Sequence, residues 1–165
     1  MRGLRSTLIL AACGCCLTLS PAFAATTYSA EDLALLAQVS KQGGALGERI
    51  SAEAADVASR DANASRCLAS LADDAIAVAE ATAGVVALVS VDVQMRNAKD
   101  DEAAAKVIGT ELDGLDKTVE NRRQAAARLQ ARCDASVMAA RAEDLAEYLD
   151  SVGQETQALR FRLSP

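Results

Sequence analysis

The sequence predicts an all-α protein, an antiparallel up-down bundle of four helices built on a central helical hairpin that turns near residue 100. Hydrophobic residues make up 51% of the chain but aromatic residues only 2%, so the core must consist of small aliphatic side chains. Alanine, the best helix former, is abundant, and glycine and proline are scarce through the middle of the chain. Apolar residues also recur every three or four positions, which is typical of amphipathic helices.

The first 24 residues have the pattern of a secretory signal peptide. Arg2 and Arg5 supply the positive start, Leu8 to Leu19 the apolar middle, and Ala22-Phe23-Ala24 a small-x-small cleavage site. We therefore expect removal of residues 1–24 by cleavage between Ala24 and Ala25. The remaining residues, 25–165, are expected to form a single helical domain that is exported to the periplasm or secreted.

A second interpretation of the same segment is a lipoprotein signal. Leu10-Ala11-Ala12-Cys13 resembles a lipobox, in which Cys13 would be acylated and anchor the protein. The apolar run before that cysteine, Ser6 to Ala12, is short, and the chain stays apolar through Leu19. Soluble export is therefore the preferred prediction, with the Cys13 anchor as its alternative.

The first helical pattern begins at Ser29-Ala30-Glu31-Asp32, which resembles a capping box. Two features weaken the pattern: the glycines at 43, 44 and 47, and the polar cluster of residues 59–65, where a helix boundary is expected. Its apolar seam comprises Leu36, Val39, Leu46, Ile50, Val57, Ala64, Cys67 and Leu71.

Ile76 to Met95 is the most apolar segment after the signal, with Glu80 and Asp92 as its only charged residues. A membrane span fits poorly with those charges, and the alternation from Val89 to Met95 permits a local strand. We expect instead a helix buried on more than one face. The polar residues 97–102 then predict a turn, with acids suited to the start of the next helix.

The seam resumes after that turn and changes phase near Ser136. If the chain reverses near Asn63 and Ser136, four helices form an up-down bundle. If it does not, two helices of about 50 residues form a coiled-coil hairpin about 75 Å long. The resumed seam comprises Ile108, Leu112, Leu115, Val119, Ala126, Leu129 and Cys133, followed by Val137, Leu145, Tyr148 and Val152.

Two cysteines, Cys67 and Cys133, remain after removal of the signal. An even pair in an oxidising compartment indicates a disulfide. Each lies 33 residues from position 100, so a hairpin folded there brings them to the same height. Both also lie on the apolar seam, and we therefore expect them to link two antiparallel helices.

The residues give no support to an enzyme. The chain has no histidine, which excludes sites that require His as base or ligand, and it has no phosphate loop or Cys-x-x-Cys pair. Asp73-Asp74 and Asp100-Asp101-Glu102 are best explained as solvated acids at helix starts. Glu80 faces Glu120 in the hairpin register, where Lys117 and Arg123 offer a salt bridge. We predict no catalytic residue, no metal site and no cofactor.

Loss of Arg2 and Arg5, the only charged residues of the signal, changes the net charge from −6 to −8. This charge argues against binding to nucleic acid. We expect a non-catalytic protein that acts through protein-protein interaction or as a structural component of the cell envelope, with no stable membrane span. Its partner would be an unidentified envelope protein or a second copy of the chain. The alternative is a ligand-binding bundle with an apolar cavity near Ile76–Val93.

Overall fold

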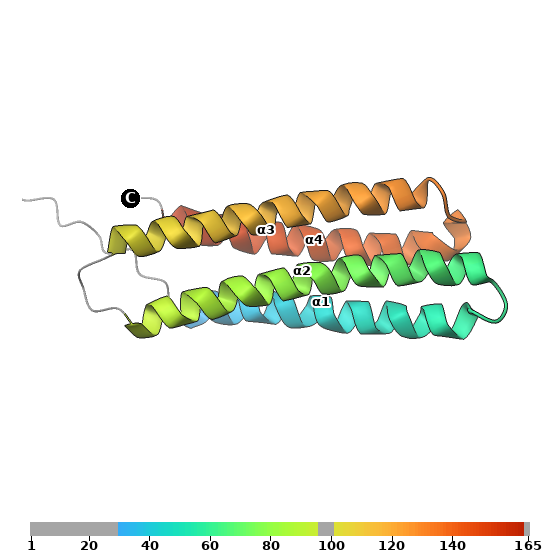
Figure 1. Ribbon diagram of the computed structural model, residues 1–165, viewed down its shortest axis with the longest axis horizontal. Helices are drawn as coiled ribbons and strands as arrows, with labels where there is room; N and C mark the ends of the chain where they lie inside the picture. The colour runs from blue at the N-terminus through green and yellow to red at the C-terminus, as the bar shows by residue number, and fades with distance from the viewer. Residues whose placement is uncertain (1–29, 96–100, 164–165) are drawn as a thin grey trace, which may run out of the picture.

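The computed structural model describes residues 30–95 and 101–163, which form four helices and no strand within those ranges (Figure 1). They are α1 (Ala30–Val57), α2 (Ala62–Met95), α3 (Asp101–Gln130) and α4 (Ala135–Leu163). Successive helices run antiparallel, so the predicted up-down bundle is confirmed. The long two-helix hairpin is wrong, because the chain reverses at residues 58–61 and again at 131–134.

The two short turns use the same chemistry to start the next helix. Asp61 accepts hydrogen bonds from the backbone N–H groups of Asn63 and Ala64, each at 2.9 Å. Asp134 accepts one from the backbone of Ser136 at 2.8 Å and one from its hydroxyl at 2.7 Å, and these bonds lower the pKa of the Asp134 carboxyl. Each aspartate is an N-cap that satisfies amide groups without a partner inside the helix.

The core is a single cluster of mainly aliphatic side chains along the bundle axis. Helix α2 contacts all three other helices, whereas α1 and α3 lie on the long diagonal, with no pair of their Cα atoms within 8 Å. Val89 is completely buried within α2, so the local strand considered for residues 89–95 is wrong. The largest fully buried side chains are Leu36, Ile50, Leu68, Leu71, Ile108, Leu112, Met138, Leu145, Leu149, Val78, Val89 and Val152.

The glycines of α1 do not interrupt the helix, and two of them permit close packing instead. A Cβ atom at Gly47 would lie 2.5 Å from Cγ1 of Ile76 on α2. A Cβ atom at Gly43 would overlap the ring of Tyr148 on α4. Both positions therefore require a residue without a side chain, although each glycine weakens the isolated helix by about 1 kcal/mol.

The predicted disulfide between Cys67 and Cys133 is present, with 6.3 Å between the two Cα atoms. Cys67 is buried in α2, but Cys133 lies in the turn after α3 rather than on a helix. The expectation of a bridge between two helices is wrong in this detail, because α3 ends at Gln130. The disulfide instead fastens the α3–α4 turn to the first part of α2.

One segment of the described chain, Ala62–Val91 in α2, is long and apolar enough to cross a membrane, with a mean hydropathy of 1.7 over its most apolar window. In the bundle this helix packs against the other three, and 39% of its most apolar window is buried. The absence of a membrane span stays a prediction from the sequence.

Candidate functional site

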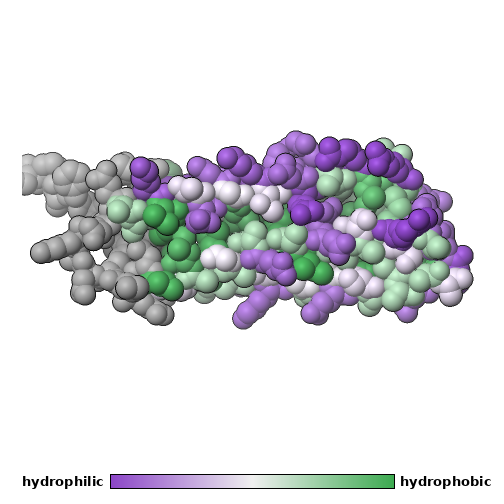
Figure 2. All heavy atoms as spheres, viewed as in Figure 1, coloured by the Kyte–Doolittle hydropathy of each residue, from purple (hydrophilic) through white to green (hydrophobic). Residues whose placement is uncertain are grey.

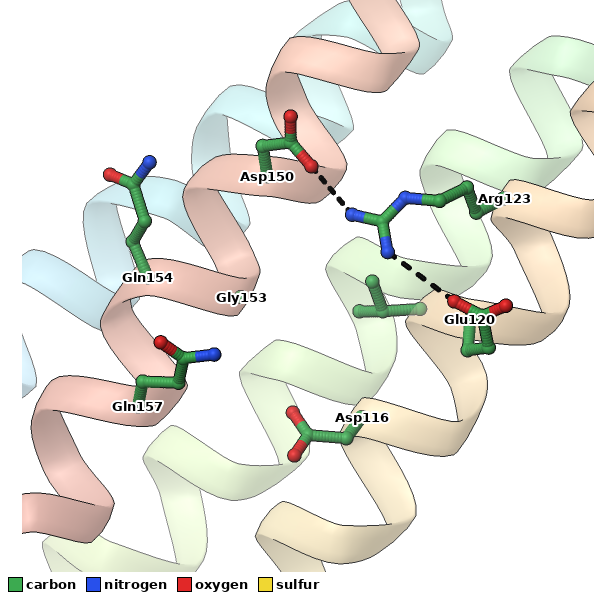
Figure 3. Close-up of a pocket in the computed structure, with 8 residues that line it drawn as sticks. Asp116, Glu120, Arg123, Asp150, Gly153, Gln154 and Gln157 are labelled. Carbon is green, nitrogen blue, oxygen red and sulfur yellow. Dashed lines mark hydrogen bonds and ion pairs between the residues drawn. The ribbon is translucent and has the colours of Figure 1, made fainter.

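A polar groove of about 440 Å³ runs between α3 and α4, and we call it the α3–α4 groove (Figure 3). Helix α3 contributes three charged side chains to it, whereas α4 contributes two amides and one carboxylate. Only Val119 adds an apolar side chain. The lining residues are Asp116, Val119, Glu120, Arg123, Asp150, Gly153, Gln154 and Gln157.

Arg123 joins the two walls of the α3–α4 groove. Its guanidinium lies between Asp150 of α4, at 2.5 Å from Oδ1, and Glu120 of its own helix, at 3.4 Å from Oε2 (Figure 3). Gln124 donates a further hydrogen bond to Glu120 at 2.8 Å. The bond from Gln124 and the nearby guanidinium lower the pKa of Glu120. Because these groups are exposed, the network orients side chains more than it stabilises the fold.

At one end of the α3–α4 groove, Asp116 links α3 to α4. Its carboxylate accepts a hydrogen bond from the hydroxyl of Thr156 at 3.2 Å and pairs with Arg160 at 2.7 Å. Arg160 also pairs with Asp113 at 2.6 Å. Thr156 is completely buried, so this set of contacts ties the register of α4 to that of α3.

Two amide side chains in the α3–α4 groove have no hydrogen-bond partner within the described part of the chain. Gln157 points across the groove towards α3, and Gln154 points away from it along α4 (Figure 3). Each amide offers a donor and an acceptor. The groove thus combines fixed carboxylates with the amide of Gln157, which has no partner among the described residues, and this suits polar recognition. It contains no pair of nucleophile and base.

The prediction of a salt bridge between helices at Glu80 is wrong. Glu80 is exposed and forms no ion pair among the described residues, while Glu120 pairs with Arg123 on its own helix. Among the described residues, Asp74 of α2 pairs with Arg122 of α3 at 3.0 Å, and Asp74 is buried well inside α2, so its interpretation as a solvated acid at a helix start is wrong. Burial raises the pKa of the Asp74 carboxyl, and the bond from Arg122 opposes that effect.

A second charged cluster joins α1 to α4. Arg141 pairs with Glu53 at 2.5 Å and with Asp144 at 2.9 Å, and Arg49 reaches the same Asp144 oxygen at 2.9 Å. These residues flank another surface groove of about 330 Å³, lined by Gln42, Leu46, Arg49, Asp144, Glu147, Tyr148 and Ser151. The four charged residues of the cluster, Arg49, Glu53, Arg141 and Asp144, each contact an opposite charge, so the cluster is best explained as a link between helices.

The other sequence-based predictions have mixed outcomes. Ala24, Ala25 and Cys13 lie outside the described residues, so cleavage and lipidation stay predictions. No group of three or more His, Cys, Asp or Glu side chains comes together to hold a metal within residues 30–95 and 101–163. The apolar cavity expected near Ile76–Val93 also stays a prediction, since the grooves described here have other linings.

The α3–α4 groove was missed in the sequence because its members look like ordinary surface residues. Gln154 and Gln157 carry no signal beyond their helical spacing.

The structure defines a class of protein, a disulfide-linked, up-down four-helix bundle with a polar surface groove. Comparison with protein-family models, with curated proteins and with solved structures finds no match for this chain.

Proposed function

We propose that this chain is an exported, non-catalytic protein of the cell envelope that binds another protein through the α3–α4 groove. The observation that carries the proposal is the amide of Gln157, which points across the groove without a hydrogen-bond partner among the described residues, beside carboxylates oriented by Arg123 and Thr156. Protein interfaces use such polar groups to fix orientation, at about one hydrogen bond per 100–200 Å².

Two further features support an exported structural role. The Cys67–Cys133 disulfide is of a kind that persists in oxidising compartments. The core contains mainly aliphatic side chains and three buried polar or charged residues, Asp74, Thr82 and Thr156, among those described. The hydroxyl of Thr82 donates to the backbone carbonyl of Val78, the hydroxyl of Thr156 donates to the Asp116 carboxylate, and Asp74 pairs with Arg122. Each thus has a structural partner.

The test is cross-linking of the tagged full chain in its native envelope, with and without Gly153→Arg. A Cβ atom at Gly153 meets nothing within 4 Å, so arginine there fills the α3–α4 groove without disturbing the core. Gly44→Arg is the matched control, since Gly44 is also an unobstructed helical glycine but lies on α1.

We expect one cross-linked species that is lost in Gly153→Arg and kept in Gly44→Arg. A species of twice the mass of the chain would identify the partner as a second copy. Cross-linking that is equal in both variants would refute the groove as the contact surface.

A further inference from the structure

The arginines of the described chain divide into a paired and an unpaired set, and the unpaired set lies at the end of the bundle that holds the disulfide. Six of the ten arginines in residues 30–95 and 101–163 form an ion pair with a described carboxylate. The other four are exposed and form no ion pair with a described residue. They are Arg60, Arg66, Arg128 and Arg132.

The disulfide end, which we define as residues 58–70 and 126–136, is positively charged although the chain as a whole is acidic. Besides the four unpaired arginines it contains two charged residues, Asp61 and Asp134, which are the N-caps of α2 and α4. Its net charge is therefore +2, in a chain of net charge −6. Figure 2 shows strongly hydrophilic residues over the last part of α3 at this end.

The disulfide brings together two of these arginines from separate elements. Arg66 of α2 and Arg132 of the α3–α4 turn each precede a bonded cysteine, and the Cα atoms of Cys67 and Cys133 are 6.3 Å apart. Neighbouring Cα atoms are about 3.8 Å apart, so those of the two arginines are separated by at most about 14 Å. Both long side chains can therefore reach one bound group.

Arg128 adds a third guanidinium from the last turn of α3. The backbone N–H groups of Ala131 and Cys133 donate to carbonyls four residues earlier, at 3.4 and 3.0 Å, so the helical spacing continues to the disulfide. Side chains four residues apart on such a spacing are neighbours, and like charges there repel each other. Since no described carboxylate neutralises Arg128 and Arg132, an anion bound between them would relieve this repulsion.

The kind of anion follows from the residue type and from the surroundings. The planar guanidinium binds a carboxylate through two parallel N–H···O bonds. Exposed acidic residues, Asp56 and Asp73, border the disulfide end. An anionic bilayer or a nucleic acid would extend beyond the arginines and face those acids, whereas a short acidic segment fits between them. Charge complementarity therefore favours a partner with a few clustered carboxylates.

We propose that the disulfide end is a docking surface for an acidic segment of another protein, whose carboxylates are bound by Arg66, Arg128 and Arg132. Because the disulfide holds the arginines of α2 and of the α3–α4 turn together, binding depends on the oxidised form. This surface is separate from the α3–α4 groove, and the proposal stands whether or not that groove binds a protein.

The test measures the fluorescence anisotropy of a labelled hexaglutamate peptide titrated with the full chain at low salt. Arg66→Gln combined with Arg132→Gln removes two charges from the disulfide end. Lys106→Gln combined with Lys117→Gln is the matched control, since both lysines are exposed and without an ion pair among the described residues but lie elsewhere on α3. We expect a loss of affinity of about fivefold or more in the arginine variant and of less than about twofold in the lysine variant.

Several results would contradict the proposal. Equal losses in the two variants would overturn it, because the peptide would then respond to total charge alone, and so would the absence of binding to the unmodified chain. Tighter binding of inorganic tripolyphosphate than of hexaglutamate, measured by competition, would overturn the acidic protein segment as the occupant. Reduction of the disulfide should weaken binding several-fold, and an unchanged affinity would contradict the dependence on the oxidised form. Circular dichroism checks that each variant and the reduced protein remain helical.

Discussion

Neighbouring glycines on α1 provide a sharp test of the packing. Gly43 and Gly44 have the same helical environment, but a Cβ atom at Gly43 would overlap the Tyr148 ring, whereas one at Gly44 meets nothing within 4 Å. Alanine is favoured over glycine within a helix by about 1 kcal/mol. Gly44→Ala should therefore stabilise the protein by up to about 1 kcal/mol.

Gly43→Ala gains the same helix propensity but forces Tyr148 to move. The ring is buried and lies against Gly43 of α1, and overpacking of a core typically costs about 1–3 kcal/mol. Because both variants gain the same helix propensity, we expect Gly43→Ala to be less stable than Gly44→Ala by the overpacking cost alone, about 1–3 kcal/mol. The measurement is urea unfolding followed by circular dichroism, with the free energy of unfolding compared at equal slope.

A second background isolates the cause. Tyr148→Leu removes the ring atoms that Gly43 accommodates, so the two alanine substitutions should then have the same effect. A penalty for Gly43→Ala that persists with Tyr148→Leu would show that the close approach is not the reason. Equal stability of the two single variants in the unmodified background would refute the packing described here.

The remaining predictions concern the disulfide, the buried phenol and the signal. Replacement of Cys67 and Cys133 by serine should lower the free energy of unfolding by about 4 kcal/mol from loop closure, with helicity kept; two free thiols on the denatured, unreduced monomer would contradict the disulfide. Burial raises the pKa of Tyr148 to about 12, only partly opposed by Thr82. The protonated phenol is thus favoured in the folded state, and stability should fall by about 2–3 kcal/mol as pH rises from about 10 to about 12. Tyr148→Phe should lack this decline in urea titrations, and an unchanged decline would argue against the buried phenol as its source. Mass spectrometry of the exported protein should show Ala25 as its first residue, whereas a diacylated Cys13 would establish the lipoprotein alternative.

Hydrophobic periodicity, together with the polar turns expected near residues 63 and 100 and the change of phase near Ser136, favoured an antiparallel four-helix bundle but left a long two-helix hairpin open. The seam residues from Leu36 to Leu71 and from Ile108 to Val119 are buried with the exception of Val57, because a period of three and four places them on one side of a helix. The equal distances of Cys67 and Cys133 from residue 100 predicted their pairing, since antiparallel helices bring such positions to the same height.

What the sequence could not determine depends on contacts between residues distant along the chain. The glycines of α1 were expected to weaken the helix, and only the close approach of Tyr148 and Ile76 explains Gly43 and Gly47. The salt bridge between α2 and α3 is formed by Asp74 and Arg122, whereas the sequence predicted one at Glu80. Helical register alone does not decide which charged side chains reach each other. The α3–α4 groove exists only where two helix surfaces meet. Composition and period determine which face of a helix is buried, whereas the packing of neighbouring helices decides which polar groups come together.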